Sequence, residues 1–435
     1  MNDPTGAVWA PPMPPAVPRG LCTDCGLSRT AQPGQCGAAC QFIAPDYPGL
    51  ETQVHGRPRD PARLDELHFG PFRRMLRASL RQPSAGAQWT GITTRIAECL
   101  LDAGAIDAVL TMAPDPADRW RPVPVLVTDA AGMAECRGMR MGYAPLLALL
   151  EPARARGYTR VAVIGIPCQV HALRAIEHTL GFDRLFVIGT PCSDNTTTER
   201  FHEFLALLAE DPATITYLEF RADYRVELRF ADGRIRLIPF LQLPISKLAQ
   251  DFFPLTCRTC VDYTNVLADL TVGYMGGQGE QWLIVRNERG EELLAALGDE
   301  VRVGPPGSAG RAGRGSARLH RQRGAGGGWA AAAVHAQLVA PFGWLADAPH
   351  RPARAGIRAH PRRDEGRRDR ATPAPPASQA AADDGAGAHL GFAGALRPGA
   401  RAGRAAARRG GGTNHADRRR RTAAATGAAP CVKTT

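Results

Sequence analysis

Two short apolar runs of nearly the same pattern stand near the middle of the chain. Each is rich in β-branched residues, ends in glycine, continues into a Pro-Cys pair and precedes a segment of helical periodicity. The run 163–165 leads to Cys168, and the run 187–189 leads to Cys192. This pattern predicts two parallel strands that deliver both cysteines to one edge of a sheet, where open α/β folds place their chemistry.

The remaining periodicity predicts further helices and strands around this pair. The predicted helices cover 60–82, 95–101, 141–156 and 200–210, the last after the polar cluster Asp194–Thr198. The predicted strands cover 107–112, 123–128, 215–220, 225–230 and 234–238, with a hairpin turn at 231–233. The fold class is therefore α/β: a mixed sheet flanked by helices, with an N-terminal loop segment and an added antiparallel portion.

An arginine row lies in the first predicted helix. Arg73, Arg77 and Arg81 recur every four residues, with Arg74 beside them, so they share one side of the helix. Such a row is either an ordinary solvated face or a docking patch for an acidic electron carrier.

Composition divides the chain into four parts. Residues 1–20 are Pro-rich, 21–84 hold the first cysteines, 85–301 hold the α/β pattern, and 302–435 form a basic tail. The tail has 24 basic and 7 acidic residues, a net charge of +17, whereas residues 1–301 have 29 and 35, a net charge of −6. The basic character thus belongs to the tail alone, and binding of the whole chain to a specific nucleic acid does not follow from it.

The tail contains too few large apolar residues for a packed core, so we expect it to be disordered. It is either a basic arm that binds polyanions or the product of a frameshift near residue 300, because GC-rich codons read out of frame yield mainly Ala, Arg, Gly and Pro. The N-terminus has no secretory signal pattern, and no apolar stretch is long enough to span a membrane. We expect a cytoplasmic protein, and peripheral contact with a membrane stays open.

Cysteine spacing indicates metal or redox chemistry rather than disulfides. Eight cysteines form the set that we expect to bind metal: Cys22, Cys25, Cys36, Cys40, Cys168, Cys192, Cys257 and Cys260. Eight thiolates are enough for two 4Fe-4S clusters. Structural zinc remains an alternative for the first four and for the last two, which could also form a redox dithiol. Cys99 fits a buried helix face, Cys136 is ambiguous and Cys431 lies in the tail.

A small-residue loop offers a second kind of site. Residues 85–94 are rich in Gly, Ala and Thr and lead directly into a predicted helix. The amide donors at the start of that helix could bind a phosphate or the edge of a flavin. The signal is weak by itself, because Gly-Thr turns are common.

Several motifs together resemble the family of deazaflavin-dependent hydrogenase/dehydrogenase beta subunits. The resemblance rests on the segments 165–173, 192–195 and 257–276, and it extends from about Cys22 to about Val301. Within that family, the segments 22–26, 40–46, 88–91 and 137–145 resemble the chlorophyll-pathway branch, which contains 8-vinyl reductases and 7-hydroxymethyl chlorophyll a reductases. The likeness is greater to the bacterial, ferredoxin-dependent 8-vinyl reductases.

The resemblance implies FAD, two 4Fe-4S clusters and reduction of the 8-vinyl group of a divinyl chlorophyllide, a magnesium tetrapyrrole, with electrons from reduced ferredoxin. It also implies a place in chlorophyll or bacteriochlorophyll biosynthesis, in the cytoplasm or peripheral to photosynthetic membranes. The implied FAD contacts are Gln88, Thr90, Gly91, Thr93, Thr94, Arg137, Arg140, Asn195, Asp262, Asn265 and Asp269. His171, one helical turn after Cys168, is the candidate proton donor, with solvent as its rival.

Two departures from the family pattern stand out. Ser28 lies where some relatives carry another cysteine, and the tail does not resemble the amphipathic region that follows residue 301 in relatives. The alternatives are a 7-hydroxymethyl chlorophyll a reductase, a deazaflavin-dependent electron-transfer subunit of a hydrogenase with no substrate site of its own, a zinc-bound module with a polyanion-binding arm, and a non-functional frameshifted product.

Overall fold

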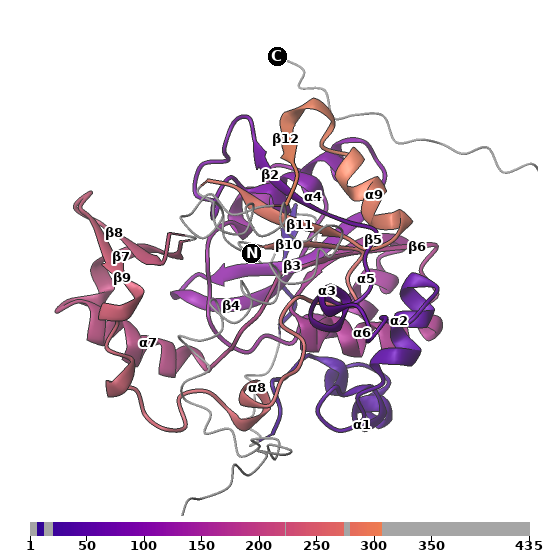
Figure 1. Ribbon diagram of the computed structural model, residues 1–435, viewed down its shortest axis with the longest axis horizontal. Coiled ribbons are helices and arrows are strands. Elements are labelled where there is room, and N and C mark those ends of the chain that lie inside the picture. The colour runs from indigo at the N-terminus through magenta and orange to yellow at the C-terminus, as the bar shows by residue number, and fades with distance from the viewer. Residues whose placement is uncertain (1–6, 13–20, 222, 274–278, 307–435) are drawn as a thin grey trace, which may run out of the picture. The chain divides into compact units, whose positions relative to one another are not determined.

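A computed structural model describes residues 7–12, 21–221, 223–273 and 279–306, all within one structural unit (Figure 1). These residues form an α/β fold with two sheets, as the periodicity predicts. Beyond residue 306, the predicted tail lies outside the described residues. The two predictions for it, a basic arm and a frameshift product, therefore stay predictions. Within the described residues, no helix combines the length and the apolar content that crossing a bilayer needs.

The larger sheet has nine strands in the order β1-β4-β3-β5-β6-β10-β11-β2-β12. Its strands are β1 Val8–Trp9, β2 Arg74–Leu80, β3 Ala108–Asp115, β4 Asp118–Val127, β5 Arg160–Gly165, β6 Arg184–Gly189, β10 Leu270–Gly273, β11 Gln281–Val285 and β12 Val301–Gly304. The central strands β3, β5, β6 and β10 are parallel, and the outer pairs are antiparallel.

Helices cover both faces of this sheet, which is why β5 and β6 are apolar after their first residue. The helices are α1 Cys36–Ala39, α2 Tyr47–His55, α3 Leu64–Phe69, α4 Ile92–Asp102, α5 Leu150–Ala155, α6 Pro167–Leu180, α7 Thr198–Leu208, α8 Leu255–Arg258 and α9 Glu288–Ala295. One core includes the apolar faces of α4 and α9, and another includes those of α2, α5 and α6 (Figure 1).

The two repeated runs form the neighbouring parallel strands β5 and β6, and this prediction is confirmed. Gly165 lies opposite Gly189 in the register, so both strands end at the same level. Helix α6 begins at Pro167, a favoured first helical residue, and therefore places Cys168 in its first turn. Cys192 follows β6 in a loop rather than a helix, because α7 begins only at Thr198.

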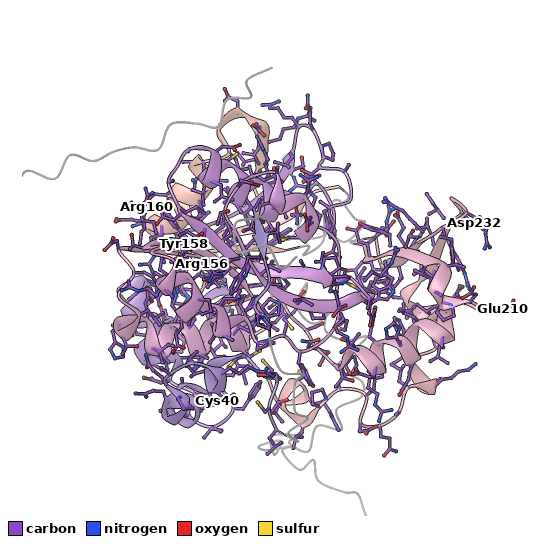
Figure 2. The ribbon with its side chains drawn as sticks, turned by 180° about the vertical axis from the view of Figure 1, so that it is seen from behind. Cys40, Arg156, Tyr158, Arg160, Glu210 and Asp232 are labelled. Atoms are coloured by element: carbon purple, nitrogen blue, oxygen red, sulfur yellow. The ribbon has the colours of Figure 1, made fainter. Side chains whose placement is uncertain are left out.

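The second sheet consists of the three antiparallel strands β7 Ile215–Phe220, β8 Arg225–Phe230 and β9 Ile235–Pro239, close to the predicted bounds. Helix α7 packs on it through Phe201 and Phe204, which share a core with Trp120 of β4. Asp232, labelled in Figure 2, lies in the predicted hairpin turn between β8 and β9. The antiparallel addition thus has a small aromatic core of its own.

The predicted helix over 60–82 is wrong in its second half. Helix α3 ends at Phe69, Gly70 follows with a φ of 70°, and β2 then pairs with both β11 and β12. A spacing of four residues puts side chains on one side of a strand as well as of a helix, so the arginine row could not distinguish the two.

The arginine row does not make a free positive patch either. Its charges are paired with acidic side chains: Arg73 with Glu288, Arg74 with Glu291 and Arg77 with Glu280, while Arg81 donates to the Asp299 carbonyl. These ion pairs leave little net charge for an acidic electron carrier to recognise.

Two other predicted boundaries differ from the structure. The segment predicted as one helix over 141–156 becomes the 3-10 turn Leu146–Leu149 followed by the short helix α5, and Pro145 precedes both. The ordered fold also continues past residue 301, because β12 runs to Gly304 and closes one edge of the large sheet. The remaining 3-10 turns are Leu27–Arg29, Pro33–Gln35, Gly132–Cys136, Pro212–Thr214, Phe240–Gln242, Ile245–Lys247 and Gly298–Glu300.

A buried ion pair supports the sheet behind these strand ends. Asp269 and Arg174 are fully buried and 2.9 Å apart, and Asp269 also accepts from Arg289 and from the Val187 amide. Burial by itself would raise the pKa of Asp269, but Arg174 and Arg289 more than offset that effect and lower it.

We expect Asp269→Asn to reduce the free energy of unfolding by about 3 kcal/mol, because it leaves a buried guanidinium without its main counter-charge. The exposed pair Arg184 and Glu292 provides the control, and Glu292→Gln should cost less than about 1 kcal/mol. Urea unfolding followed by circular dichroism measures both values. Equal, small effects of the two substitutions would contradict the structural role of Asp269.

Candidate functional site

The N-terminal cysteines form one group of thiols. Burial raises the pKa of the Cys25 thiol to about 12, and the charges of Cys36, Cys22 and Cys40 add to that effect. Cys36 begins α1 and Cys40, labelled in Figure 2, follows it, so the two lie one helical turn apart. The structure therefore brings the first four predicted ligands together.

The other four predicted ligands form a second group. Burial raises the pKa of the Cys192 thiol, and the charges of Cys168, Cys257 and Cys260 raise it further. Cys257 lies in the short helix α8 and Cys260 two residues after its end, so three separate segments supply these thiols. We call the two sets the N-terminal quartet and the central quartet. Cys168 also interacts electrostatically with Cys25, so the quartets are neighbours.

Neither quartet is a ready site for a single metal ion. In the part of the chain that the structure describes, no three His, Cys, Asp or Glu side chains converge closely enough to hold one ion. The thiols of each quartet interact at a longer range, and all eight are free of disulfides. A bound cluster separates its thiolate ligands more widely than one zinc ion does, because the ligands attach to different iron atoms.

Hydrogen-bond donors point at the sulfur atoms of both quartets. The side-chain Nε2 of Gln41 lies 3.3 Å from Cys260 Sγ, and the Thr23 hydroxyl lies 3.5 Å from Cys168 Sγ. The backbone amide of Asp24 lies 3.3 Å from Cys22 Sγ. A backbone donor at Asn195 lowers the pKa of Cys257, although burial dominates and raises it to about 12. Donors of this kind favour sulfur in its anionic, ligating form.

A cavity of about 380 Å³ opens beside the central quartet, and Cys192 is one of its lining residues. Seven of the predicted flavin contacts line this cavity: Gln88, Gly91, Thr93, Thr94, Arg137, Arg140 and Asn195. They come from the 88–91 loop, the first turn of α4, the 137–140 segment and the loop after β6. The sequence motifs thus converge on one volume of the size that proteins use to bind small ligands.

Internal hydrogen bonds fix the polar end of the cavity. The Arg140 guanidinium donates to the carbonyls of Cys136, Gly138, Glu135 and Arg137, and burial lowers its pKa to about 10. Arg137 donates to the Ala85 carbonyl and pairs with Glu98 of α4.

Three buried polar atoms of this lining lack a hydrogen-bond partner among the described residues: Nε of Arg137, Nε of Arg140 and Oε1 of Gln281. Buried polar atoms normally have partners. Two donors and one acceptor thus remain for a ligand.

Four predicted flavin contacts do not line the cavity. Thr90 accepts from the Leu80 amide, Asp262 accepts from the Val266 amide, and Asp269 belongs to the buried ion pair described above. Asn265 donates to the carbonyls of Gly165 and Thr190, the residues that end β5 and follow β6. These side chains support the site from behind.

His171 is buried in α6 and does not line the cavity. Its Nδ1 lies 3.0 Å from the Ala39 carbonyl, its ring packs edge-on against Tyr47, and burial lowers its pKa. These contacts tie α6 to α1. The role of proton donor stays a prediction, and this position does not favour it.

Some residues at or beside the cavity were not among the predicted contacts. Glu219 of β7 accepts from the Trp89 amide at 2.7 Å and from the Tyr217 hydroxyl at 2.6 Å, so the small sheet holds the 88–91 loop. Asp194 lines the cavity, and burial raises its pKa to about 7. A wall of aromatic residues from α7, β7 and the segments after β9 completes the lining. In the sequence, the adjacent pair Phe252 and Phe253 was the local feature that could have indicated this aromatic lining.

A parallel α/β core with two thiol quartets beside a ligand cavity has the features of an oxidoreductase. The sequence matches the two family models of the coenzyme F420 hydrogenase/dehydrogenase beta subunit, the N-terminal model over residues 75–151 and the C-terminal model over residues 158–304. The chain therefore belongs to the family of coenzyme F420 hydrogenase/dehydrogenase beta subunits, as its motifs predict. Members of this family generally carry iron-sulfur clusters and FAD.

Three curated relatives are similar over part of the chain. An uncharacterized protein of Nostoc is 39% identical over 286 residues, which are 66% of this chain and 72% of that protein. The chloroplastic 7-hydroxymethyl chlorophyll a reductase of rice is 38% identical over 63% of this chain and 61% of its own length. A component of the F(420)H(2) dehydrogenase of Methanosarcina mazei is 30% identical over 51% of this chain and 62% of its own length.

We expect Asn265→Gly to loosen the edge that carries Cys168 and Cys192. Glycine tolerates the φ of 58° at this position, so the substitution removes the two side-chain hydrogen bonds without adding backbone strain. The free energy of unfolding should fall by about 1–3 kcal/mol, because the Thr190 carbonyl loses its side-chain donor and the Gly165 carbonyl keeps only its bonds from Thr190. Urea unfolding and the rate of thiol alkylation, read by mass spectrometry, measure the change.

The control for this prediction is Gln32→Ala, which removes an exposed side-chain hydrogen bond to Thr179. It should change stability by no more than about 0.5 kcal/mol. Alkylation of Cys168 and Cys192 at the wild-type rate in Asn265→Gly would show that Asn265 does not position them.

Proposed function

We propose that the chain is an iron-sulfur flavoprotein reductase that acts on a chlorophyll-type magnesium tetrapyrrole. The observation that carries the proposal is the double position of Cys192, which belongs to the central quartet and also lines the cavity. Electrons held at the quartet would therefore reach a ligand in the cavity over a short distance.

The thiols fit iron-sulfur clusters. Each quartet offers four thiols that form no disulfide, and N–H or O–H donors point at three of the sulfur atoms. Burial would keep unligated thiols protonated, whereas binding to iron removes the protons and compensates the charge. We assign one 4Fe-4S cluster to each quartet.

The polar end of the cavity fits the isoalloxazine ring of FAD. A flavin edge presents both acceptors and an N–H donor, which match the free Nε atoms of Arg137 and Arg140 and the free Oε1 of Gln281. Thr93 and Thr94 lie in the first turn of α4, whose amide donors and dipole favour a phosphate. Gln88, Gly91 and Asn195 complete the contacts that we assign to the cofactor.

The bound groups would supply the redox chemistry: clusters accept single electrons from a carrier such as reduced ferredoxin, and a flavin converts them into two-electron reduction. The residues of the chain hold the reacting groups together, exclude water and keep the polar edge fixed. Reduction of a hydroxymethyl group consumes two electrons and two protons and gives a methyl group and water. Reduction of a vinyl group consumes the same number and gives an ethyl group.

The similarity to the rice enzyme favours the hydroxymethyl group as the one that is reduced. Reduction of the 8-vinyl group of divinyl chlorophyllide is the second candidate, because within the chlorophyll-pathway branch the motifs resemble the bacterial 8-vinyl reductases more. The match covers 61% of the rice enzyme, so its activity, substrate and partners come to this chain as proposals. A role as a hydrogenase component without a substrate site would leave the aromatic wall of the cavity without a ligand.

Protein purified without oxygen should reduce one of the two pigments when reduced ferredoxin is supplied. 7-hydroxymethyl chlorophyll a and divinyl chlorophyllide are tested in parallel, with product identified by chromatography and mass spectrometry. Turnover of the first supports the main proposal, and turnover of only the second supports reduction of the 8-vinyl group. Oxidation of reduced deazaflavin with no change in either pigment would contradict both.

We expect Cys192→Ala to abolish pigment reduction and to remove about four of about eight iron atoms per chain, because the central quartet loses one ligand. Cys99→Ala is the matched control, since Cys99 is a buried cysteine of α4 outside both quartets, and it should keep the full iron content. Iron and sulfide analysis measures the loss independently of activity. Full iron in Cys192→Ala would remove Cys192 from the ligand set.

A further inference from the structure

The cavity has two chemically different ends. The polar end consists of loop backbone, threonines and the two arginines, and we have assigned it to the flavin. The other end consists mainly of aromatic, aliphatic and thioether side chains that belong to the core of the small sheet or pack against it: Met139, Met141, Phe201, Phe204, Phe220, Phe240, Ile245, Leu248, Phe252 and Phe253. We call this end the aromatic wall.

Some rings of the aromatic wall are almost fully buried, and others are half-buried. Phe201, Phe204 and Phe252 are almost fully buried in the core of the small sheet. Phe220, Phe240 and Phe253 are only partly buried, although they pack against that core.

Phe240 packs edge-on against Phe220 at 6.0 Å, and Phe253 packs edge-on against Phe252 at 4.8 Å. These perpendicular contacts brace each half-buried ring against an aromatic neighbour. The half-buried rings are therefore held in place without being fully buried in the core.

The wall carries almost no free charge. Arg221 is the charged residue of the small sheet that lines the cavity, and it pairs with Glu227 at 2.6 Å and with Asp223 at 3.3 Å. Its charge is thus compensated within its own sheet. A polyanionic ligand would find no free cation among the described residues at this end, whereas a flat apolar ligand would meet rings and thioether groups.

We propose that the aromatic wall, centred on Phe240, is the binding surface for the face of the tetrapyrrole macrocycle. This inference rests on the proposed function and adds the part of the cavity that recognises the substrate. A magnesium chlorin is a wide, flat and largely apolar ring, so offset stacking and contact with Met139 and Met141 suit it. The macrocycle would lie between the small sheet and the flavin end, with its reducible substituent directed at the latter.

The test is a pigment-binding titration without any electron donor. Chlorophyllide a is titrated into oxidised, cofactor-replete protein, and quenching of its fluorescence gives the dissociation constant. Phe240→Ala should bind about tenfold more weakly or worse, because it removes a stacking ring from the wall. Phe240→Leu should be intermediate, since it keeps apolar contact but loses the ring.

The matched control is Phe182→Ala. Phe182 is a similarly half-buried ring that packs in the core around α6 and lies outside the cavity lining. We expect wild-type pigment affinity in this variant. The flavin content of Phe240→Ala, read from its visible absorbance after unfolding, should equal that of the wild type, because the flavin contacts lie at the other end.

The outcomes separate the two proposals. Wild-type affinity in Phe240→Ala would overturn the aromatic wall as the substrate surface while pigment reduction by the wild type still stands. Loss of flavin together with pigment would overturn the division of the cavity into two ends. Tight binding of a free deazaflavin cofactor at the wall, with no pigment bound by the wild type, would contradict the proposed function itself.

Discussion

The alignment of β5 and β6 is the constraint on which the site depends. Their register sets Gly165 opposite Gly189, so the two Pro-Cys pairs leave the sheet at one level. A Cβ at Gly189 would lie 2.6 Å from the Ala268 Cβ and 2.7 Å from the Asn265 Cγ, so only glycine allows the Asn265 segment to approach this closely. Asn265 then links the two strand ends through its side-chain amide. The two repeated runs of the sequence thereby end side by side at one edge of the sheet.

Burial sets the chemical properties of the thiols near this edge. Eight thiols lie in two neighbouring groups, and burial raises the pKa of Cys25, Cys168, Cys192 and Cys257. As free groups they would stay protonated and contribute little more than small apolar contacts. The N-terminal segment that carries one quartet has mostly single-turn helices, such as α1, and contributes only a few residues to the core. Ligation of the N-terminal quartet would thus hold this segment together more firmly than its own packing does.

Much of the fold follows from local pattern, and the failures have a common cause. The β-branched runs and the alternation in 215–238 predicted β5 to β9 closely, because period and burial agree there. The arginine row misled because a spacing of four satisfies both periods, and the break at Gly70 was the signal that was missed. Seven of the flavin contacts predicted from the motifs line one cavity. They could not show that Asp262, Asn265 and Asp269 point into the protein, since a polar side chain near a motif can serve either the ligand or the backbone behind it.

The two sheets contribute different parts of the site. The large sheet supplies the strand ends that lead to Cys168 and Cys192 and much of the polar end of the cavity, and the family models match residues 75–151 and 158–304, which include the small sheet as well. The small sheet supplies the aromatic wall, and it also holds the 88–91 loop through Glu219. A change in the small sheet would therefore alter what the cavity accepts while the path from Cys192 to the polar end stays intact. In the proposed function, redox chemistry and substrate choice would therefore lie on separate elements of the fold.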